Sequence, residues 1–575
     1  MYLVAESFRS FDLRSRRRII GILLLTAMGA FLEAAGAALI VPFVAMINDP
    51  SYLSTQTQLR ALFEMSPFHT TEGFLIATAL ALFLFFVIKN AFVVGVLNTQ
   101  FSFVYGEMPR FSCTLYQGYL TRPLAEHGRM NSAEMIRNVN NEVQLYFTNF
   151  LIPTLTLITE ALVLIAIVAV LLLIAPMPAL AAIVLLGGMT KAFYAVVRAR
   201  VNKYGHDAQH HNAERIKWVN QGLNSIKETK ILGREDFFVQ NFNFHENRFA
   251  ESSRYAMLLN QTPRLFIETL AFTALFLGVA LALGVGQNRS VVLPVLALFA
   301  LAAIRLLPSL NRILLSLTRM AYYRPAALVV LDSRRFAVES DANLKFASQQ
   351  RSLKDWKELC LQDVSFHYPD SGQSILTNVN LTIKRGTSVA LVGPSGSGKT
   401  TLADLVLGLL TPVSGKIEVD GRDIHSVLVD WQGELGYIPQ SIYLLDDTIR
   451  RNIAFGVPDD LIDDQQVWKA LHYASMGDVV SALPGQLDCS VGENGSCLSG
   501  GQRQRLGIAR ALYREPHFLV LDEATSALDE ATEREIAETL DKLVGERTLL
   551  VIAHRPETVR RCQVKYDVSR GEFVE

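Results

Sequence analysis

One short segment of the chain has the residue types and spacing needed to hold a phosphate group. Residues 393–400 read Gly-Pro-Ser-Gly-Ser-Gly-Lys-Thr and fit the pattern G-x-x-x-x-G-K-[ST]. In such a loop, glycines let backbone N–H groups turn inward around phosphate oxygens, and the following helix adds positive potential. We expect Lys399 to reach the β- and γ-phosphates of a nucleotide and the Thr400 hydroxyl to bind Mg²⁺. The residues expected to line this loop are Gly393, Pro394, Ser395, Gly396, Ser397, Gly398, Lys399, Thr400 and Thr401.

A second segment supplies a pair of carboxylates. Residues 518–521 are Phe-Leu-Val-Leu, which predicts a buried strand, and Asp522 and Glu523 follow directly. An acidic pair is more often only solvated charge, but its place at the end of an apolar strand favours a role in phosphoryl transfer. That reaction needs positioning and charge neutralisation. We expect Asp522 to hold Mg²⁺ through its hydration shell and Glu523 to polarise the attacking water.

These residues need a scaffold of alternating strands and helices. The phosphate-loop motif follows an apolar strand at 388–392 and precedes a helical stretch at 401–410. Beyond residue 357, short β-rich segments alternate with amphipathic helices, which predicts a parallel α/β sheet. We place a nucleotide-binding domain at 358–575, a polar linker at 326–357 and a transmembrane domain at 1–325.

The first part of the chain has the composition of a membrane protein. Apolar residues make up 50% of the whole chain and charged residues 19%. Six apolar stretches reach the length of about 20 residues that a helix needs to cross a bilayer. They are Ile19–Ile47, Phe74–Asn98, Phe147–Ile174, Met177–Val197, Leu265–Val285 and Val291–Leu317.

Basic residues indicate the orientation of these spans. Five arginines precede the first span, and the segment 198–262 is also rich in Lys and Arg, whereas the segment 48–73 has only Arg60. By the positive-inside rule, both termini and the long segments 99–146 and 198–263 are cytosolic. We read those segments as helical extensions of the spans that carry force between a motor and the membrane domain. No basic face of the kind that binds nucleic acid is sustained outside the membrane flanks.

A third motif resembles a known family. Residues 498–502, Leu-Ser-Gly-Gly-Gln, resemble the signature motif of ATP-binding-cassette proteins, and the order and spacing of further motifs agree from about 358 to 560. The resemblance implies that Tyr368 stacks on adenine, Gln440 senses the γ-phosphate and Mg²⁺, and His554 contacts the γ-phosphate. It assigns Asp529 to the loop after the acidic pair. The expected metal ligands are Thr400, Gln440 and Asp522, and the signature contacts to ATP are Ser499, Gly500, Gly501 and Gln502.

The resemblance also implies a dimer. In this family two cassettes stack head to tail, and each ATP lies between the phosphate loop of one and the signature of the other. This chain has one cassette, so it must pair. The presence of Glu523, His554 and a full signature favours a homodimer, although a heterodimer with a degenerate partner remains open.

The arrangement of domains resembles a half-size exporter. Residues 491–495 resemble the segment with which exporter cassettes contact the intracellular loops, and six spans precede one cassette. The implied fold is multidomain: an all-α six-helix transmembrane exporter domain plus an α/β P-loop ATP-binding-cassette domain. An ATP-gated channel or a regulator is the alternative from another class, but the intact Glu523 and His554 count against it.

Positively charged residues within the spans indicate what kind of substrate the protein binds, because intramembrane charges are costly and usually functional. Arg305, Arg312 and Arg319 recur at seven-residue intervals, so they share one helix face. Lys89 and Arg264 extend the set of candidate substrate contacts. A cationic stripe suits an anionic head group. The competing interpretation is structural, with cations at the interface or paired inside the bundle with Glu33, Glu160 and Glu268.

A further resemblance narrows the substrate class. Residues 305–313 resemble a bacterial lipid-linked oligosaccharide flippase, and residues 58–65 predict a short external helix with Leu59, Leu62 and Phe63 on one face. That helix would meet a polyprenyl tail or merely cap the bundle. We therefore expect a homodimeric ATPase of the bacterial inner membrane that moves a polyprenyl-diphosphate glycan or a related anionic lipid. The alternatives are multidrug, peptide or lipid A export.

Overall fold

The computed structural model describes residues 2–48, 57–68, 70–174, 187–284, 289–346, 355–369, 372–522, 547–552 and 559–574, with single positions at 180, 184, 353 and 545. Within helices some side chains are not described, including all those at 289–305. The chain forms two compact units. One comprises residues 1–121 and 130–340, and the other comprises 122–129 and 341–575.

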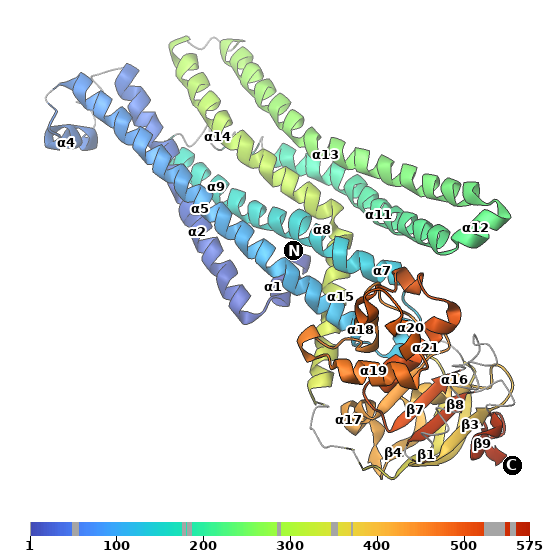
Figure 1. Cartoon of the computed structure of the whole chain (residues 1–575). Coiled ribbons are helices and arrows are strands. Elements are labelled where there is room, and N and C mark those ends of the chain that lie inside the picture. Colours follow the sequence, from blue (N-terminus) through green and yellow to red (C-terminus); the bar gives the residue numbers. More distant parts are fainter. Residues whose placement is uncertain are drawn as a thin grey trace. The chain divides into compact units, whose positions relative to one another are not determined.

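The first unit is built from long helices that run side by side (Figure 1). α5 and α13 contain 50 residues each, more than twice the ~20 that cross a bilayer. Two π-helical turns, Asn138–Glu142 and Phe147–Leu151, lie between α7 and α9. The helices are α1 (Tyr2–Ser10), α2 (Leu13–Asn48), α4 (Thr57–Met65), α5 (Thr71–Leu120), α7 (Ser132–Arg137), α8 (Val143–Tyr146), α9 (Ile152–Ile174), α11 (Gly188–Asn224), α12 (Ile226–Leu232), α13 (Glu235–Gly284), α14 (Arg289–Tyr322) and α15 (Arg324–Phe346).

The predicted spans fall on these helices. Among the described residues, three stretches are long and apolar enough to cross a membrane: Leu13–Val44, Thr71–Leu120 and Ser132–Val170. The fifth and sixth predicted spans lie on α13 and α14. The fourth begins in residues 175–187, which lie mostly outside the described residues, and ends in α11. Both segments expected to extend the spans are helical over most of their length, as predicted.

An aromatic cluster packs Phe11, which lies between α1 and α2, against α5 and the π-helical turn Phe147–Leu151. Phe111 of α5 contacts Phe11 at 5.2 Å and Phe147 at 5.0 Å between ring centroids. The Arg334 guanidinium of α15 lies 3.6 Å from the centre of the Phe111 ring. Because Ala327 and Val330 of α15 are also buried in this cluster, the start of the stretch predicted to be a linker packs with the first unit.

The external segment folds as the predicted helix, α4, but one of the three residues predicted to share a face does not lie on it. Leu59 and Phe63 pack towards Met46 and Phe74, and the rings of Phe63 and Phe74 are perpendicular at 5.3 Å. Leu62 was expected on the same face, yet it is 61% exposed. Four-residue spacing places Leu59 and Phe63 on one face, whereas position 62 is rotated about 100° from position 63.

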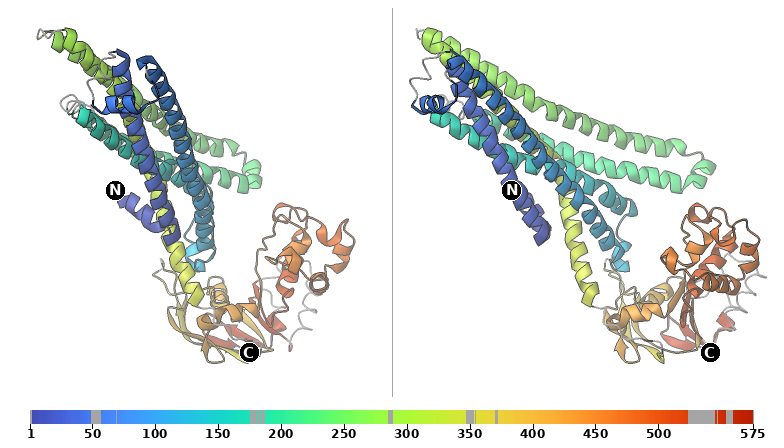
Figure 2. Two further views of the ribbon diagram at one scale, coloured as in Figure 1. Left: turned by 90° about the vertical axis from the view of Figure 1, so that its left-hand side faces the viewer. Right: turned by 60° about the vertical axis from the view of Figure 1, so that its left-hand side comes forward.

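The second unit has two sheets (Figures 1 and 2). One has the order β10-β9-β3-β8-β7-β6, with β3, β6, β7, β8 and β9 parallel where they pair. The other is antiparallel with the order β2-β1-β4-β5. The strands are β1 (Glu358–Phe366), β2 (Leu376–Lys384), β3 (Ser388–Val392), β4 (Ser414–Val419), β5 (Arg422–Asp423), β6 (Leu435–Ile438), β7 (Phe518–Asp522), β8 (Thr548–Ile552), β9 (Val564–Asp567) and β10 (Glu572–Val574).

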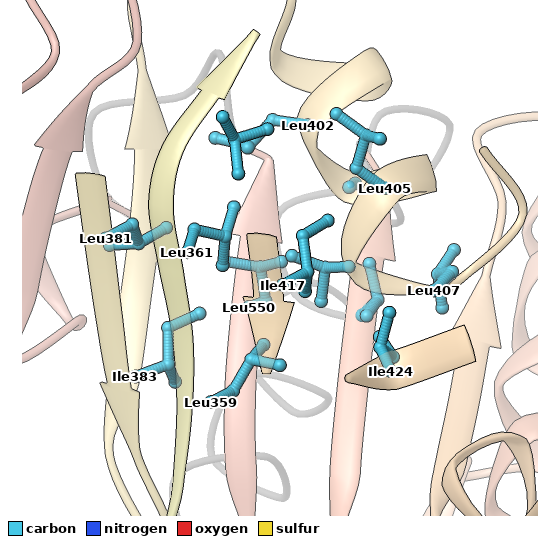
Figure 3. Packing of buried hydrophobic residues seen from close by; sticks show 14 of the residues in the cluster. Leu359, Leu361, Leu381, Ile383, Leu402, Leu405, Leu407, Ile417, Ile424 and Leu550 are labelled. Atoms are coloured by element: carbon cyan, nitrogen blue, oxygen red, sulfur yellow. The ribbon is translucent and has the colours of Figure 1, made fainter. Parts of the chain in front are cut away.

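Short helices complete this unit. They are α6 (Leu124–His127), α16 (Lys399–Val406), α17 (Leu428–Gly433), α18 (Ile449–Ile453), α19 (Asp464–Tyr473), α20 (Gly477–Ser481) and α21 (Gly500–Leu512). Every residue of β7 and β8 is buried, as expected for central strands covered on both faces. Figure 3 shows Leu402 and Leu405 of α16 packed over Leu361, Ile417 and Leu550. This core fixes α16, whose first residue is Lys399.

Candidate nucleotide site

The phosphate-loop motif joins β3 to α16, as predicted. Three of its glycines have positive φ: Gly393 (139°), Gly396 (83°) and Gly398 (91°). A Cβ at Gly398 would lie 2.9 Å from a methyl group of Leu376. Both the backbone conformation and the lack of space therefore require glycine there.

The Lys399 side chain lies across this loop. Its residue is buried, and Nζ donates hydrogen bonds to the carbonyl oxygens of Gly393 (2.9 Å) and Pro394 (3.0 Å). These two bonds fix a positive charge at the loop, and no carboxylate in the described part of the chain pairs with it. An ammonium held at a glycine-rich loop is the arrangement that binds nucleotide phosphates.

Asp522 is the last residue of β7 and lies at the same edge of the sheet as the phosphate loop. β8 lies between β3 and β7, and the three strands are parallel, so their carboxyl ends meet at one edge. Asp522 is buried. The structure thus brings the phosphate loop and the first acidic residue to one edge.

Two residues that the sequence analysis missed belong to this acidic region. Burial, followed by the charge of Asp522, raises the pKa of Asp404 to about 6. Burial and the carboxylates of Asp522 and Asp404 raise the pKa of Tyr437 to about 12. Asp404 lies one helical turn after Thr400, a spacing that could have revealed it. Tyr437 depends on the pairing of β6 with β7, which no local pattern shows.

The oxygen atoms in this region suit a magnesium ion. The expected ligands offer a hydroxyl (Thr400), an amide (Gln440) and a carboxylate (Asp522), and hard cations such as Mg²⁺ prefer oxygen. Thr400 is the second residue of α16 and is exposed, and Gln440 follows β6 and is also exposed. Among the described residues, no group of three or more His, Cys, Asp or Glu side chains forms a metal site.

Tyr368 lies just beyond β1 at the edge of the core. Its ring is perpendicular to that of Phe366, with 5.1 Å between their centroids, and it is only partly buried. One aromatic ring thus supports another that keeps some accessible surface, as a stacking platform for a base requires.

The signature motif forms the start of α21. Ser499 is the N-cap: its Oγ accepts a hydrogen bond from the Gln502 backbone N–H (3.2 Å), and the Gln502 side-chain oxygen accepts one from the Ser499 N–H (2.9 Å). This capping box leaves Ser499 and Gly500 exposed. The N-terminus of a 13-residue helix is therefore presented with its positive potential at the surface.

Substitutions at Ser499 should separate its two functions. Ser499→Ala removes the cap and should cost about 1 kcal/mol, lowering the melting temperature by ~2–4 °C, whereas Ser499→Gly should cost only a few tenths. Both remove the hydroxyl, so both should lose most ATPase activity. Thermal unfolding and steady-state hydrolysis measure the two effects. Wild-type hydrolysis by Ser499→Gly would show that the residue is only a helix cap.

Three expected catalytic or contact residues lie outside the described residues: Glu523, Asp529 and His554. Their roles remain predictions. The described neighbour of Glu523 is Asp522, and that of His554 is the end of β8.

The side chains proposed to contact the substrate differ in their burial and in their neighbours. Arg312 of α14 pairs with Glu160 of α9 at 2.9 Å, as the competing structural interpretation allowed, yet its side chain stays 54% exposed while that of Glu160 is only 6% exposed. Lys89 is buried, with Nζ 5.1 Å from the centre of the Phe86 ring. Arg264 is exposed on α13. The side chain of Arg305 lies outside those described.

Comparisons with known proteins place the chain in a family. The family model described as "ABC transporter" matches residues 376–526. The "ATP-dependent lipid A-core flippase" of Bordetella avium is 30% identical over 423 residues, which is 73% of this chain and 70% of that protein. The chain belongs to the ABC transporter family. The flippase of the same description from Ralstonia nicotianae is 34% identical to this ABC transporter over 384 residues, 66% of this chain.

The match also has limits in length. This ABC transporter spans 64% of the Ralstonia protein, slightly less than two thirds. A solved structure, described as a bacterial Atm1-family ABC exporter with ATP bound, superposes with a TM-score of 0.75, 23% identity and coverage of 97% of this chain and 94% of that one. The likeness shows the fold: a helical transmembrane domain and an α/β nucleotide-binding domain, as the sequence predicted.

Proposed function

We propose that this protein is an ATP-driven exporter of the flippase type, and that it moves a polyprenyl-diphosphate glycan or a related anionic lipid. The observation that carries the substrate class is Arg312. Its guanidinium lies in a predicted span, yet it remains 54% exposed after pairing with Glu160. Glu160 contacts one of its nitrogens, and an accessible guanidinium in a span is costly unless its remaining N–H groups meet a further anion.

Hydrolysis would use the nucleotide site described above. Lys399 and the loop glycines would hold the phosphates, and Thr400, Gln440 and Asp522 would hold Mg²⁺, which neutralises charge that develops during phosphoryl transfer. Glu523 would orient and polarise the attacking water. His554 would contact the γ-phosphate, and Asp529 would lie beside the paired cassette.

Two exposed surfaces support a homodimer. The signature helix presents its N-terminus at the surface, where a second phosphate loop would meet it. At the end of the α11–α13 hairpin, α12 exposes Ile226, Ile231 (83% exposed) and Leu232 (68%). Apolar side chains on an exposed tip are a liability unless a partner covers them, and a second copy's cassette is the partner that alternating access requires.

A further segment supports coupling within one chain. Residues 122–129, between α5 and α7, belong to the cassette unit, and Ala125 packs against its core. We infer that ATP closes the paired cassettes, that this segment and α12 transmit the movement, and that hydrolysis resets the dimer. The basic N-terminal segment supports an inner-membrane location with both termini in the cytosol.

Lipid A export is the second candidate, because the two flippases above are described as lipid A-core flippases. Lipid A is also an anionic lipid, so a cationic contact fits both substrates. The external helix α4 favours a long isoprenoid tail in our proposal: Leu62 and Met65 are exposed apolar residues on its outer side.

The experiment is ATP hydrolysis by the protein in lipid, with and without a polyprenyl-diphosphate glycan. We expect stimulation that Arg305→Ala/Arg312→Ala loses, because hydrogen bonds to a charged group contribute about 1.5–3 kcal/mol, or roughly 10- to 100-fold in affinity. Arg324→Ala is the matched control, since Arg324 is exposed and opens α15 beyond the predicted span. Stimulation by lipid A alone would move the substrate to the second candidate.

Glu160→Gln provides a second test of the same contact. It removes the carboxylate that competes for Arg312, so a direct contact with an anionic lipid predicts equal or tighter substrate binding. If Arg312 acts only in folding, Glu160→Gln and Arg312→Ala should both lower the melting temperature. Neither variant should then change the half-saturating lipid concentration.

A further inference from the structure

A pocket of about 640 Å³ lies between α2 and α5, which run side by side in Figures 1 and 2. Its walls come from the first turns of the first predicted span and from the turns of α5 that directly follow the second. The main lining residues are Arg18, Ile22 and Leu25 on α2, with Thr99, Ser102 and Phe103 on α5.

The lining combines one cation with hydroxyl and apolar groups. Arg18 is its only charged residue, and among the described residues no carboxylate pairs with it. Ser102 places a hydroxyl group on the opposite wall, whereas the Thr99 hydroxyl beside it already donates to the Gly95 carbonyl oxygen at 2.8 Å. The pocket therefore offers hydrogen-bond donors and one positive charge beside apolar surface, which matches the phosphate and the upper acyl chain of an anionic phospholipid.

Two buried hydrogen bonds join α2 to α5 and so fix the spacing between the walls of the pocket. On one side of it, Ser15 Oγ donates to Glu107 Oε1 at 2.9 Å. On the other side, Gln100 Nε2 donates to Thr26 Oγ1 at 3.1 Å. All four side chains are buried. Because both bonds join α2 to α5, the pocket between these helices is already formed. Ligand binding therefore does not require the loss of entropy that ordering the pocket would cost.

The position of the pocket fits the cytosolic leaflet. Arg18 is the last of a basic cluster that includes Arg14 and Arg17, and the positive-inside rule places this cluster at the cytosolic interface. Further along α2, Leu24 and Met28 are exposed apolar residues. A phosphate at Arg18 would therefore leave its acyl chain beside apolar side chains, and anionic lipids are attracted to such basic segments.

We propose that the α2–α5 pocket binds an anionic phospholipid of the cytosolic leaflet, with Arg18 donating hydrogen bonds to its phosphate. This site is separate from the substrate contact at Arg312, and it does not depend on which lipid the protein transports. Its occupant is a resident lipid that stabilises the α2–α5 pair at the membrane surface.

A tryptophan placed at the pocket tests this directly. Leu24→Trp puts a reporter at a lining position that is 68% exposed, and the four native tryptophans, at positions 218, 356, 431 and 468, lie outside the predicted spans. In vesicles with brominated lipids, we expect brominated phosphatidylglycerol to bind at the reporter about fivefold more tightly than brominated phosphatidylcholine. Arg18→Ala should abolish this preference.

Arg17→Ala is the matched control, because Arg17 is exposed, adjacent and absent from the lining. It should keep the preference. Equal quenching by both lipids, or equal loss in Arg17→Ala, would overturn the proposal. So would a lack of quenching by either lipid, which would mean that a second copy covers the pocket. Native mass spectrometry of proteins without the reporter gives an independent measure: Arg18→Ala, but not Arg17→Ala, should retain less phosphatidylglycerol than wild type.

Discussion

Glu523→Gln should reduce ATP hydrolysis by about a hundredfold or more while leaving ATP binding intact. A carboxylate that accepts or orients a proton in the transition state contributes roughly 10²–10⁴ in rate, and the amide keeps the shape of the side chain without its basicity. Because the bound nucleotide then persists, the variant should also accumulate as a closed dimer. Single-turnover hydrolysis and size-exclusion chromatography with ATP measure the two effects.

The control for this substitution is Glu530→Gln, which makes the same change of charge seven residues further along the chain. It should hydrolyse ATP at close to the wild-type rate. Rapid turnover by Glu523→Gln would contradict its assignment as the residue that polarises water. A stalled variant that remains monomeric with ATP would instead contradict the head-to-tail dimer.

Lys399→Ala should weaken ATP binding by about 100-fold. The ammonium is fixed at the loop by bonds to the Gly393 and Pro394 carbonyls, and hydrogen bonds to a charged group contribute about 1.5–3 kcal/mol each. Lys399→Arg should also bind poorly, because a planar guanidinium does not replace a compact ammonium in a buried position. Equilibrium binding of a fluorescent ATP analogue measures both.

Lys384→Ala is the matched control, since Lys384 is an exposed lysine at the end of β2 in the same unit. It should bind ATP as wild type does. A Lys399→Ala variant with unchanged affinity would mean that this loop does not hold the phosphates. Loss of affinity together with a large drop in melting temperature would point to a disrupted loop, and Lys399→Met, which keeps the aliphatic stem, would separate the two explanations.

Local patterns predicted much of the cassette. The strand expected at 388–392 coincides with β3, and the strand predicted from 518 ends at Asp522 in β7. Both consist mainly of apolar residues and are followed or ended by a glycine or an acidic residue, so the signal lies within a few positions. The Ser499 cap was not predicted, although its signal is equally local, because a capping box needs only four consecutive residues.

Contacts between distant segments could not be predicted in the same way. Asp404 and Tyr437 approach Asp522 only because α16 packs on the sheet and β6 pairs with β7. The α2–α5 pocket likewise depends on hydrogen bonds between residues 92 and 74 positions apart. In the external helix, periodicity placed Leu62 with Leu59 and Phe63, but packing against Phe74 selected only the pair four residues apart.

The most direct test of the central claim is transport itself. The protein is reconstituted into vesicles with a fluorescent polyprenyl-diphosphate glycan, and movement of the lipid between leaflets is followed by protection from a membrane-impermeant quencher. We predict movement that requires ATP and Mg²⁺, stops in Glu523→Gln and slows in Arg312→Ala. ATP hydrolysis without any movement of this lipid, together with ATP-dependent movement of lipid A in the same vesicles, would contradict the proposed substrate.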